Sequence, residues 1–163
     1  MSIKNSIGAT LSIERFQGFV TVIIPISKNC GNEKLPVQDV YKDIEDLKKV
    51  WPRLVEIIIF PFEHPSVKYK DLNCSDFDDE YKKEGRPIHI MEISDLNGPS
   101  AHPLLKTLRK DVMRAEELTI NTPQYFVLNP SWSKLQYHYS KSLSDMRDVL
   151  KEMIKKMVRS DEL

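Results

Sequence analysis

The chain alternates between short apolar runs and longer segments in which apolar residues recur at helical spacing. Runs rich in Val and Ile and bounded by turn residues are typical of buried strands. Val20–Ile26 is the strongest of these runs, and Asn129-Pro130-Ser131 predicts the turn of a later hairpin. We predict five strands of one sheet, near residues 19–26, 55–60, 88–93, 125–128 and 134–139.

Three helices and an amino-terminal hairpin complete the predicted elements. The hairpin lies between Ile3 and Ile13, around the turn Ser6-Ile7-Gly8-Ala9. Ser100 and Pro103 suit the cap and first turn of the middle helix. The last helix carries a Met-bearing stripe, a pattern that indicates core packing more than a partner groove. The helices are expected near residues 36–50, 101–115 and 143–158.

The order of these elements predicts one α/β domain over residues 1–163. Strands that alternate with helices favour parallel crossovers, and the chain then closes with an antiparallel hairpin and a helix. This order resembles the thioredoxin-like plan, a central mixed sheet flanked by helices, here with an amino-terminal β-hairpin. Thr122-Pro123 stands where thioredoxin-like folds place a cis-proline facing the reactive cysteine, so we predict a cis bond close to Cys30; the alternative is an ordinary trans proline.

Composition removes several classes of function. Lys plus Arg and Asp plus Glu number 24 each, so net charge gives no electrostatic case for a nucleic acid or an anionic membrane as partner. No apolar run is long enough for a membrane span. The two cysteines, Cys30 and Cys74, are too few for a disulfide framework or a zinc cluster, but they suffice for one redox pair.

Cys30 lies in the predicted loop between the strand 19–26 and the helix 36–50. In an open α/β sheet, ligands and reactive groups collect at this position. A thiol near a helix N-terminus also experiences a positive dipole that favours the thiolate. Cys30 is therefore a candidate nucleophile, and a plain buried cysteine is the alternative.

Five stretches resemble motifs of the glutathione peroxidases, spread over nearly the whole chain. They are similar, in order, to V-S-L-x-K-Y-x-G, N-V-A-S-x-C-G, E-I-L-G-F-P, C-T-R-F and V-D-V-N-G-x-x-A-x-P-L. The Asp-Leu-Asn-Gly sequence within the last is the most specific match. The stretches are Leu11–Gly18, Pro25–Gly31, Glu56–Pro61, Cys74–Phe77 and Ser94–Leu104.

The resemblance implies a peroxidatic role for Cys30 and a resolving role for Cys74, as in the thioredoxin-dependent members. The chain departs from the family around this pair: His64 takes the position of a site Gln, the site Trp is gone, and Asn121 or Thr122 stands for the site Asn. Lys28, His64 and Asn121 could supply part of the donor set that a peroxidatic thiol needs.

Two functions follow from these residues. One is a thiol peroxidase or thiol-disulfide oxidoreductase, which needs no cofactor and takes a peroxide together with a thiol reductant, such as glutathione or a thioredoxin-like or protein-disulfide-isomerase-like protein. The retained Cys30-Gly31 and Cys74 favour it. The other is a catalytically degenerate binding module, which the lost Trp and Gln favour.

The remaining signals concern location and metals. Ser160-Asp161-Glu162-Leu163 resembles the Lys-Asp-Glu-Leu retrieval signal and predicts the endoplasmic reticulum lumen, with the last residues extending beyond the closing helix. No apolar signal peptide precedes the fold, and the alternative is an ordinary acidic tail in the cytoplasm. The four histidines, at 64, 89, 102 and 138, lack metal-ligand spacing, so no metal site is predicted.

Overall fold

The computed structural model describes residues 1–5, 8–27, 45–62, 88–92, 94–113, 124–139 and 146–161. A helical segment covers residues 45–50, within the first predicted helix. The other elements are β1 (Ser2–Lys4), β2 (Thr10–Ser12), the 3-10 helix η1 (Ile13–Phe16), β3 (Val20–Ser27), β4 (Val55–Phe62), β5 (Ile88–Ile90), α3 (Pro103–Met113), β6 (Gln124–Leu128), β7 (Leu135–Tyr139) and α4 (Met146–Asp161).

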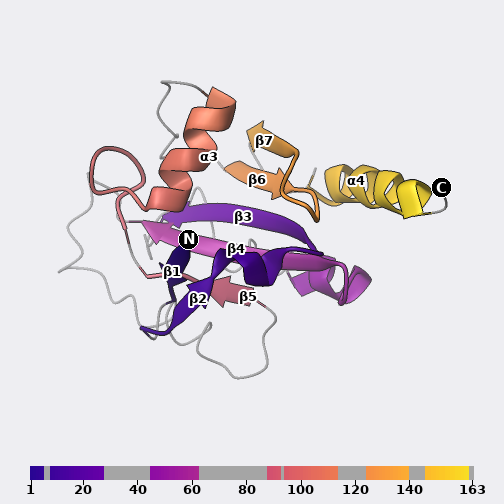
Figure 1. Ribbon diagram of the computed structural model, residues 1–163, viewed down its shortest axis with the longest axis horizontal. Coiled ribbons are helices and arrows are strands. Elements are labelled where there is room, and N and C mark those ends of the chain that lie inside the picture. Colours follow the sequence, from indigo (N-terminus) through magenta and orange to yellow (C-terminus); the bar gives the residue numbers. More distant parts are fainter. Residues whose placement is uncertain are drawn as a thin grey trace.

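Five strands form one mixed sheet in the order β5-β4-β3-β6-β7. β3 is parallel to β4, and β4 is parallel to β5, whereas β6 is antiparallel to both β3 and β7. The arrows of β3 and β4 point the same way in Figure 1, and β6 points the opposite way. All five predicted sheet strands are therefore present, and the amino-terminal hairpin is the antiparallel pair β1–β2.

The two faces of the sheet build two separate cores, because successive side chains of a strand point to opposite faces. On one face, Val22 and Ile57 pack with the stripe of α4 and with Leu47 of the segment 45–50. On the other face, Ile23 and Ile58 pack with the apolar side of α3 and with η1. The predicted Met stripe of α4 is core in part: Met146, Leu150, Met153 and Ile154 are buried, while Val149 and Met157 are half-buried.

Two buried prolines lie inside the central strands, and the direction of their backbone nitrogens explains why they are tolerated. The Val20 N–H donates to the Leu54 carbonyl, so it faces β4. Backbone nitrogens alternate in direction along a strand, so the nitrogen of Pro25, five residues later, faces β6. The β3–β6 ladder accordingly ends at the Ile23–Phe126 pair. The nitrogen of Pro61 faces the side where β5 has already ended at Ile90. Neither proline therefore costs a ladder hydrogen bond.

Several element boundaries differ from the sequence prediction. β4 was predicted to stop at Pro61 but continues to Phe62, for the reason just given. The strand expected over 88–93 is shorter, because β5 ends at Ile90 and Met91 forms a bridge with Asn5 instead. η1 was not predicted, and α4 extends to Asp161, three residues beyond the predicted end. Ser160 and Asp161 therefore belong to the helix rather than to an extended tail, and location in the endoplasmic reticulum stays a prediction.

A half-buried ionic cluster joins the segment 45–50 to β4 and β5. The Lys48 ammonium donates to the Val55 carbonyl at 2.6 Å and lies 3.5 Å from Glu56 Oε2. His89 Nε2 donates to the same carboxylate oxygen at 3.0 Å. Partial burial of Glu56 favours its neutral form, but the hydrogen bond from His89 and the charge of Lys48 outweigh it and lower the pKa of Glu56.

We expect Glu56→Gln to lower the free energy of unfolding by about 1–3 kcal/mol, because Lys48 would keep its charge in a site where its side chain is only 8% exposed. Urea denaturation at neutral pH measures this. Glu152→Gln is the matched control: its partner Lys155 is 3.9 Å away on the exposed face of α4, so the expected loss is at most about 0.5 kcal/mol. Equal losses in the two variants would show that the half-buried cluster adds nothing to the free energy of unfolding.

Candidate functional site

The strand ends that flank the predicted reactive residues lie at one end of the sheet. We call this end an edge, meaning the side that runs across the strands and not an outermost strand. The carboxyl ends of β3 and β4 lie side by side, since Ser27 pairs with Phe62. β6 runs antiparallel to β3, so its amino end at Gln124 points to this same edge. Residues that precede α3 join the edge through the bridge between Phe62 and Ser94. Figure 1 shows the ends of β3 and β4 directed toward one side of the molecule, where α3 begins.

The predicted site residues Cys30, His64, Cys74 and Asn121 all lie outside the described residues, as do Lys28 and the Thr122-Pro123 bond. Three of them follow or precede the strand ends of this edge by only a few residues in the sequence. Cys30 comes three residues after the end of β3, His64 two residues after the end of β4, and Asn121 three residues before β6. Cys74 has no such tie to a described element.

The side chain of His102 lies beside this edge of the sheet. Its ring lies against Phe60 of β4, with 4.8 Å between the ring centroids, and only 7% of the residue is exposed. Its Nδ1 accepts a hydrogen bond from the backbone N–H of Leu104 at 3.0 Å. His102 therefore caps the first turn of α3, and Nε2 carries the proton of the neutral ring.

The sequence prediction missed this role. Ser100 was expected to cap the helix, but α3 begins at Pro103, and the residue directly before it, His102, supplies the capping acceptor. Pro103 does occupy the first helical position, as predicted. The position of His102 could have indicated this role, because a side-chain acceptor directly before a proline in the first helical position is well placed to cap the helix, even when it is a histidine.

Burial lowers the pKa of His102, because it disfavours the charged ring, while the negative charge of Glu92 acts in the opposite direction. As the pH falls, a histidine of the unfolded chain, with a pKa of about 6.5, therefore binds a proton before the native ring of His102 does. The unfolded state then binds more protons, so this group's contribution to stability is complete above about pH 6.5 and is lost as the pH falls below it.

We expect His102→Asn to flatten part of the pH dependence of stability between about pH 7.5 and about pH 5.5. Asparagine keeps an acceptor for the Leu104 N–H but does not titrate. The measurement is urea denaturation of both proteins at the two pH values. If the wild type and the variant lose the same free energy of unfolding over this interval, His102 is not the titrating group.

The other described histidines have separate structural roles. His89 belongs to the cluster with Lys48 and Glu56, and its ring meets Phe16 edge-on. His138 stacks on Tyr125, with 5.0 Å between centroids. Within the described ranges, no three His, Cys, Asp or Glu side chains gather closely enough to hold a metal ion.

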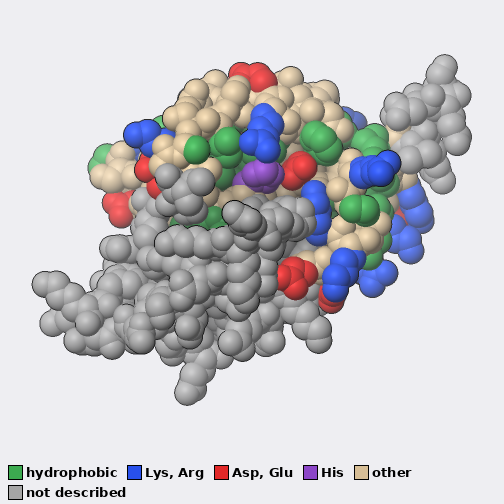
Figure 2. Space-filling model, turned by 90° about the horizontal axis from the view of Figure 1, so that it is seen from below, with side chains coloured by type: hydrophobic (Ala, Val, Ile, Leu, Met, Phe, Trp, Pro, Cys, Tyr) green, Lys and Arg blue, Asp and Glu red, His purple; other side chains and the backbone are tan. Residues whose placement is uncertain are grey.

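The surface charge of the described residues is mixed. Lys and Arg side chains alternate with Asp and Glu side chains over the coloured part of Figure 2, in line with the equal numbers of the two signs in the sequence. Among the helices of the described ranges, none combines the length and the apolar character that crossing a bilayer requires.

Comparison with known structures defines the class of fold. The crystal structure of Trgpx in apo form is similar, with a TM-score of 0.69 and 19% identity, over 95% of this chain and 93% of that one. The structure of T. cruzi GPX1 has a TM-score of 0.60 and 15% identity, over 94% and 92%. BsSco, of the Sco family of cytochrome c oxidase assembly proteins, has a TM-score of 0.63 and 16% identity, over 95% and 90%.

The chain therefore has a thioredoxin-like fold, which confirms the predicted fold class. At these identities the likeness is one of fold. No protein-family model and no curated protein matches the sequence, so membership of the glutathione peroxidases stays a prediction.

Proposed function

We propose that the protein is a thiol oxidoreductase that reduces peroxides through Cys30, with Cys74 as the resolving cysteine. The observation that supports this proposal most is the edge where β3, β4 and β6 meet. Cys30 follows β3 by three residues, so chain connectivity keeps its Cα within about 11 Å of the Cα of Ser27. His64 and Asn121 are tethered to the same edge in the same way.

The proposed reaction has three balanced steps. The Cys30 thiolate attacks one oxygen of the peroxide, the O–O bond breaks, and the departing alkoxide or hydroxide takes a proton to leave as an alcohol or water. Cys30 is then a sulfenic acid. The Cys74 thiolate attacks its sulfur, forming a disulfide and releasing the hydroxyl group as water. A dithiol protein or two molecules of glutathione finally reduce the disulfide to two thiols and are themselves oxidised to a disulfide.

His102 lies beside the carboxyl end of β4 but brings no positive charge to this chemistry, because burial lowers its pKa and its Nδ1 is used to cap α3. The same edge receives the N-terminus of α3, whose dipole favours an anion such as a thiolate.

Mass spectrometry of the peroxide-treated protein tests the proposal. One equivalent of hydrogen peroxide added to the reduced chain is expected to produce an intramolecular Cys30–Cys74 disulfide with the loss of two hydrogens. Cys74→Ser is the matched variant, and it is expected to stop at the sulfenic acid, which dimedone traps on Cys30.

The binding-module alternative predicts a different result. The lost Trp and the lost Gln, whose position His64 takes, favour a degenerate site, because a peroxidatic thiol needs donors for the departing oxygen. In that case Cys30 resists both peroxide and iodoacetamide in the folded protein, and neither the disulfide nor the dimedone adduct forms.

A further inference from the structure

A half-open cavity of about 770 Å³ lies between the β6–β7 turn and α4. It is at the opposite end of the sheet from the edge where β3 and β4 end, because β6 is antiparallel to β3 and its last residue, Leu128, pairs with Thr21 near the start of β3. The volume is in the range of small-molecule sites. We refer to this space, lined by Asn129, Pro130, Ser131, Lys134, Gln136, Asp148, Val149, Glu152, Met153, Lys156 and Met157, as the turn–α4 cavity.

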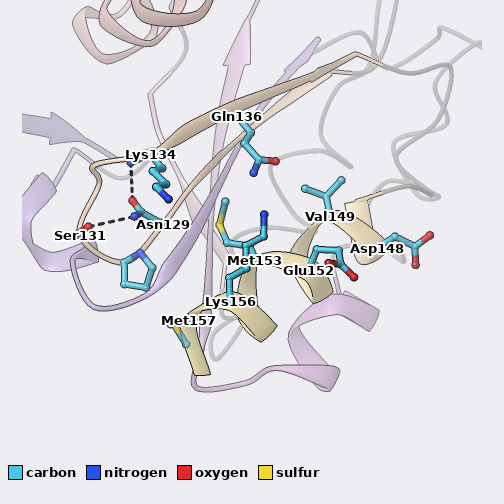
Figure 3. A pocket seen from close by; sticks show the side chains of 11 residues that line it. Asn129, Ser131, Lys134, Gln136, Asp148, Val149, Glu152, Met153, Lys156 and Met157 are labelled. Carbon is cyan, nitrogen blue, oxygen red and sulfur yellow. Dashed lines mark hydrogen bonds between the residues drawn. The ribbon is translucent and has the colours of Figure 1, made fainter. Parts of the chain in front are cut away.

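The turn–α4 cavity has an apolar wall and a group of donors. Val149, Met153 and Met157 line it from α4 at helical spacing. In Figure 3 the side chains of Lys134, Gln136 and Lys156 point toward one space beside Met153. The Gln136 carbonyl oxygen already accepts from His138 Nε2 at 3.0 Å, which leaves its amide N–H groups as the donors that face the cavity.

Lys134 and Lys156 bring two ammonium groups to the lining, which also holds the carboxylates of Asp148 and Glu152. Neither the Lys134 nor the Lys156 ammonium forms an ion pair among the residues that the structure describes. The acids of the lining are directed elsewhere: Glu152 pairs with Lys155 at 3.9 Å, and the Asp148 carboxylate points away from the centre in Figure 3.

The turn that carries Lys134 is held in place before any ligand arrives. The Asn129 side chain accepts from the Lys134 backbone N–H at 2.9 Å and donates to Ser133 Oγ at 2.9 Å. The Gly18 N–H donates to the Pro130 carbonyl at 2.9 Å, which ties the turn to the segment before β3. Trp132 keeps a left-handed backbone, with φ of 59°, that a bulky residue rarely adopts without such support.

We propose that the turn–α4 cavity binds an amphipathic anion, a carboxylate or phosphate head on an apolar chain. The head would lie between Lys134, Lys156 and the Gln136 amide, and the chain would lie along the methionine wall of α4. Unpaired ammonium groups next to thioether and methyl groups match this chemistry, because a charge-assisted hydrogen bond fixes the head while apolar burial holds the tail.

Titration calorimetry of the full chain with dodecanoate, kept below its micelle-forming concentration, tests the proposal. We expect one binding site per chain. In NMR spectra of the same titration, we expect changes in backbone amide chemical shifts only within residues 129–136 and 148–157. Lys134→Gln and Lys156→Gln are each expected to weaken binding on the order of tenfold. Lys151→Gln, which removes an exposed lysine of α4 outside the lining, is the matched control and should bind as the wild type does.

Two further ligands separate the contribution of the anionic head to binding from that of the apolar tail, and vesicles identify the source of the ligand. Dodecyltrimethylammonium should not bind, and acetate should bind far more weakly than dodecanoate. Vesicles that contain phosphatidylglycerol show whether a membrane lipid can also fill the cavity. If the chain sediments with the vesicles and this requires Lys134 and Lys156, a membrane lipid is a second source of the ligand. If the chain does not sediment with them, the ligand is a free amphiphile.

Four outcomes would overturn the proposal: no binding of dodecanoate, equal binding of the cationic amphiphile, full affinity in both lysine variants, or binding to vesicles alone. None of them bears on the proposed function of Cys30, which is assayed separately.

Discussion

Replacing Cys30 with serine is expected to abolish peroxide consumption by the reduced protein, with a fall in rate on the order of a thousandfold or more. A serine hydroxyl is not ionised near neutral pH and is a poor nucleophile toward a peroxide oxygen, whereas a thiolate attacks it directly. Stopped-flow mixing of the reduced chain with hydrogen peroxide, followed by the loss of peroxide, measures the effect.

Cys74→Ser distinguishes the two thiols in the same assay. This variant keeps the attacking sulfur, so it should consume one equivalent of peroxide at the wild-type rate and then fail to turn over with a dithiol reductant. A Cys30→Ser protein that consumed peroxide as fast as the wild type would refute the assignment of the nucleophile. Equal thermal unfolding of the three proteins is the check that the fold is intact.

Phe126→Ala is expected to cause the largest loss of stability, about 3–5 kcal/mol. Phe126 is fully buried in β6, pairs with Ile23 in the central strand, and meets Tyr137 with 5.2 Å between ring centroids. The truncation removes the buried packing contacts of the ring and leaves a cavity in the core that faces α3. A loss of this size is a large part of the stability of a typical domain.

Urea denaturation measures this change, and Val50→Ala is its control. Val50 is an apolar residue that is 44% exposed, so its truncation should alter the free energy of unfolding by no more than about 0.5 kcal/mol. If Phe126→Ala unfolds at the same urea concentration as the wild type, the core on the α3 face does not have the packing described above.

The local pattern of the sequence was sufficient for most of the fold. The runs in β3 and β4 are apolar on both faces, which is typical of buried parallel strands, and the structure places them at the centre of the sheet. The boundaries were less predictable, because they depend on neighbours. Whether a strand continues through Pro61 depends on which side its nitrogen faces and on where β5 ends, and neither is visible in the local sequence.

Contacts between residues far apart in sequence were the part that could not be predicted. Glu56 and His89 are 33 positions apart, and the hydrophobic pattern contains no sign that they share a hydrogen bond. The turn–α4 cavity likewise takes its donors from β7, the turn before it and α4. The candidate site is predictable only as far as its framework: the strand ends that flank Cys30, His64 and Asn121 share one edge, while the residues themselves lie outside the described part of the chain.

Pro25 and Pro61 have a consequence for the newly made chain. β3 and β4 are the most apolar stretches of the protein, and β3 cannot pair on its second side until residues 124–128 have been synthesised. Fibril-forming segments need about six or seven consecutive residues without proline. Pro25 ends the run Phe19–Ile24 and Pro61 ends the run Leu54–Phe60, so each apolar run stops at about that length, and the second run also carries the charge of Glu56. We expect the two prolines to keep either run from extending into a longer fibril-forming segment, at positions where the finished sheet loses no hydrogen bond.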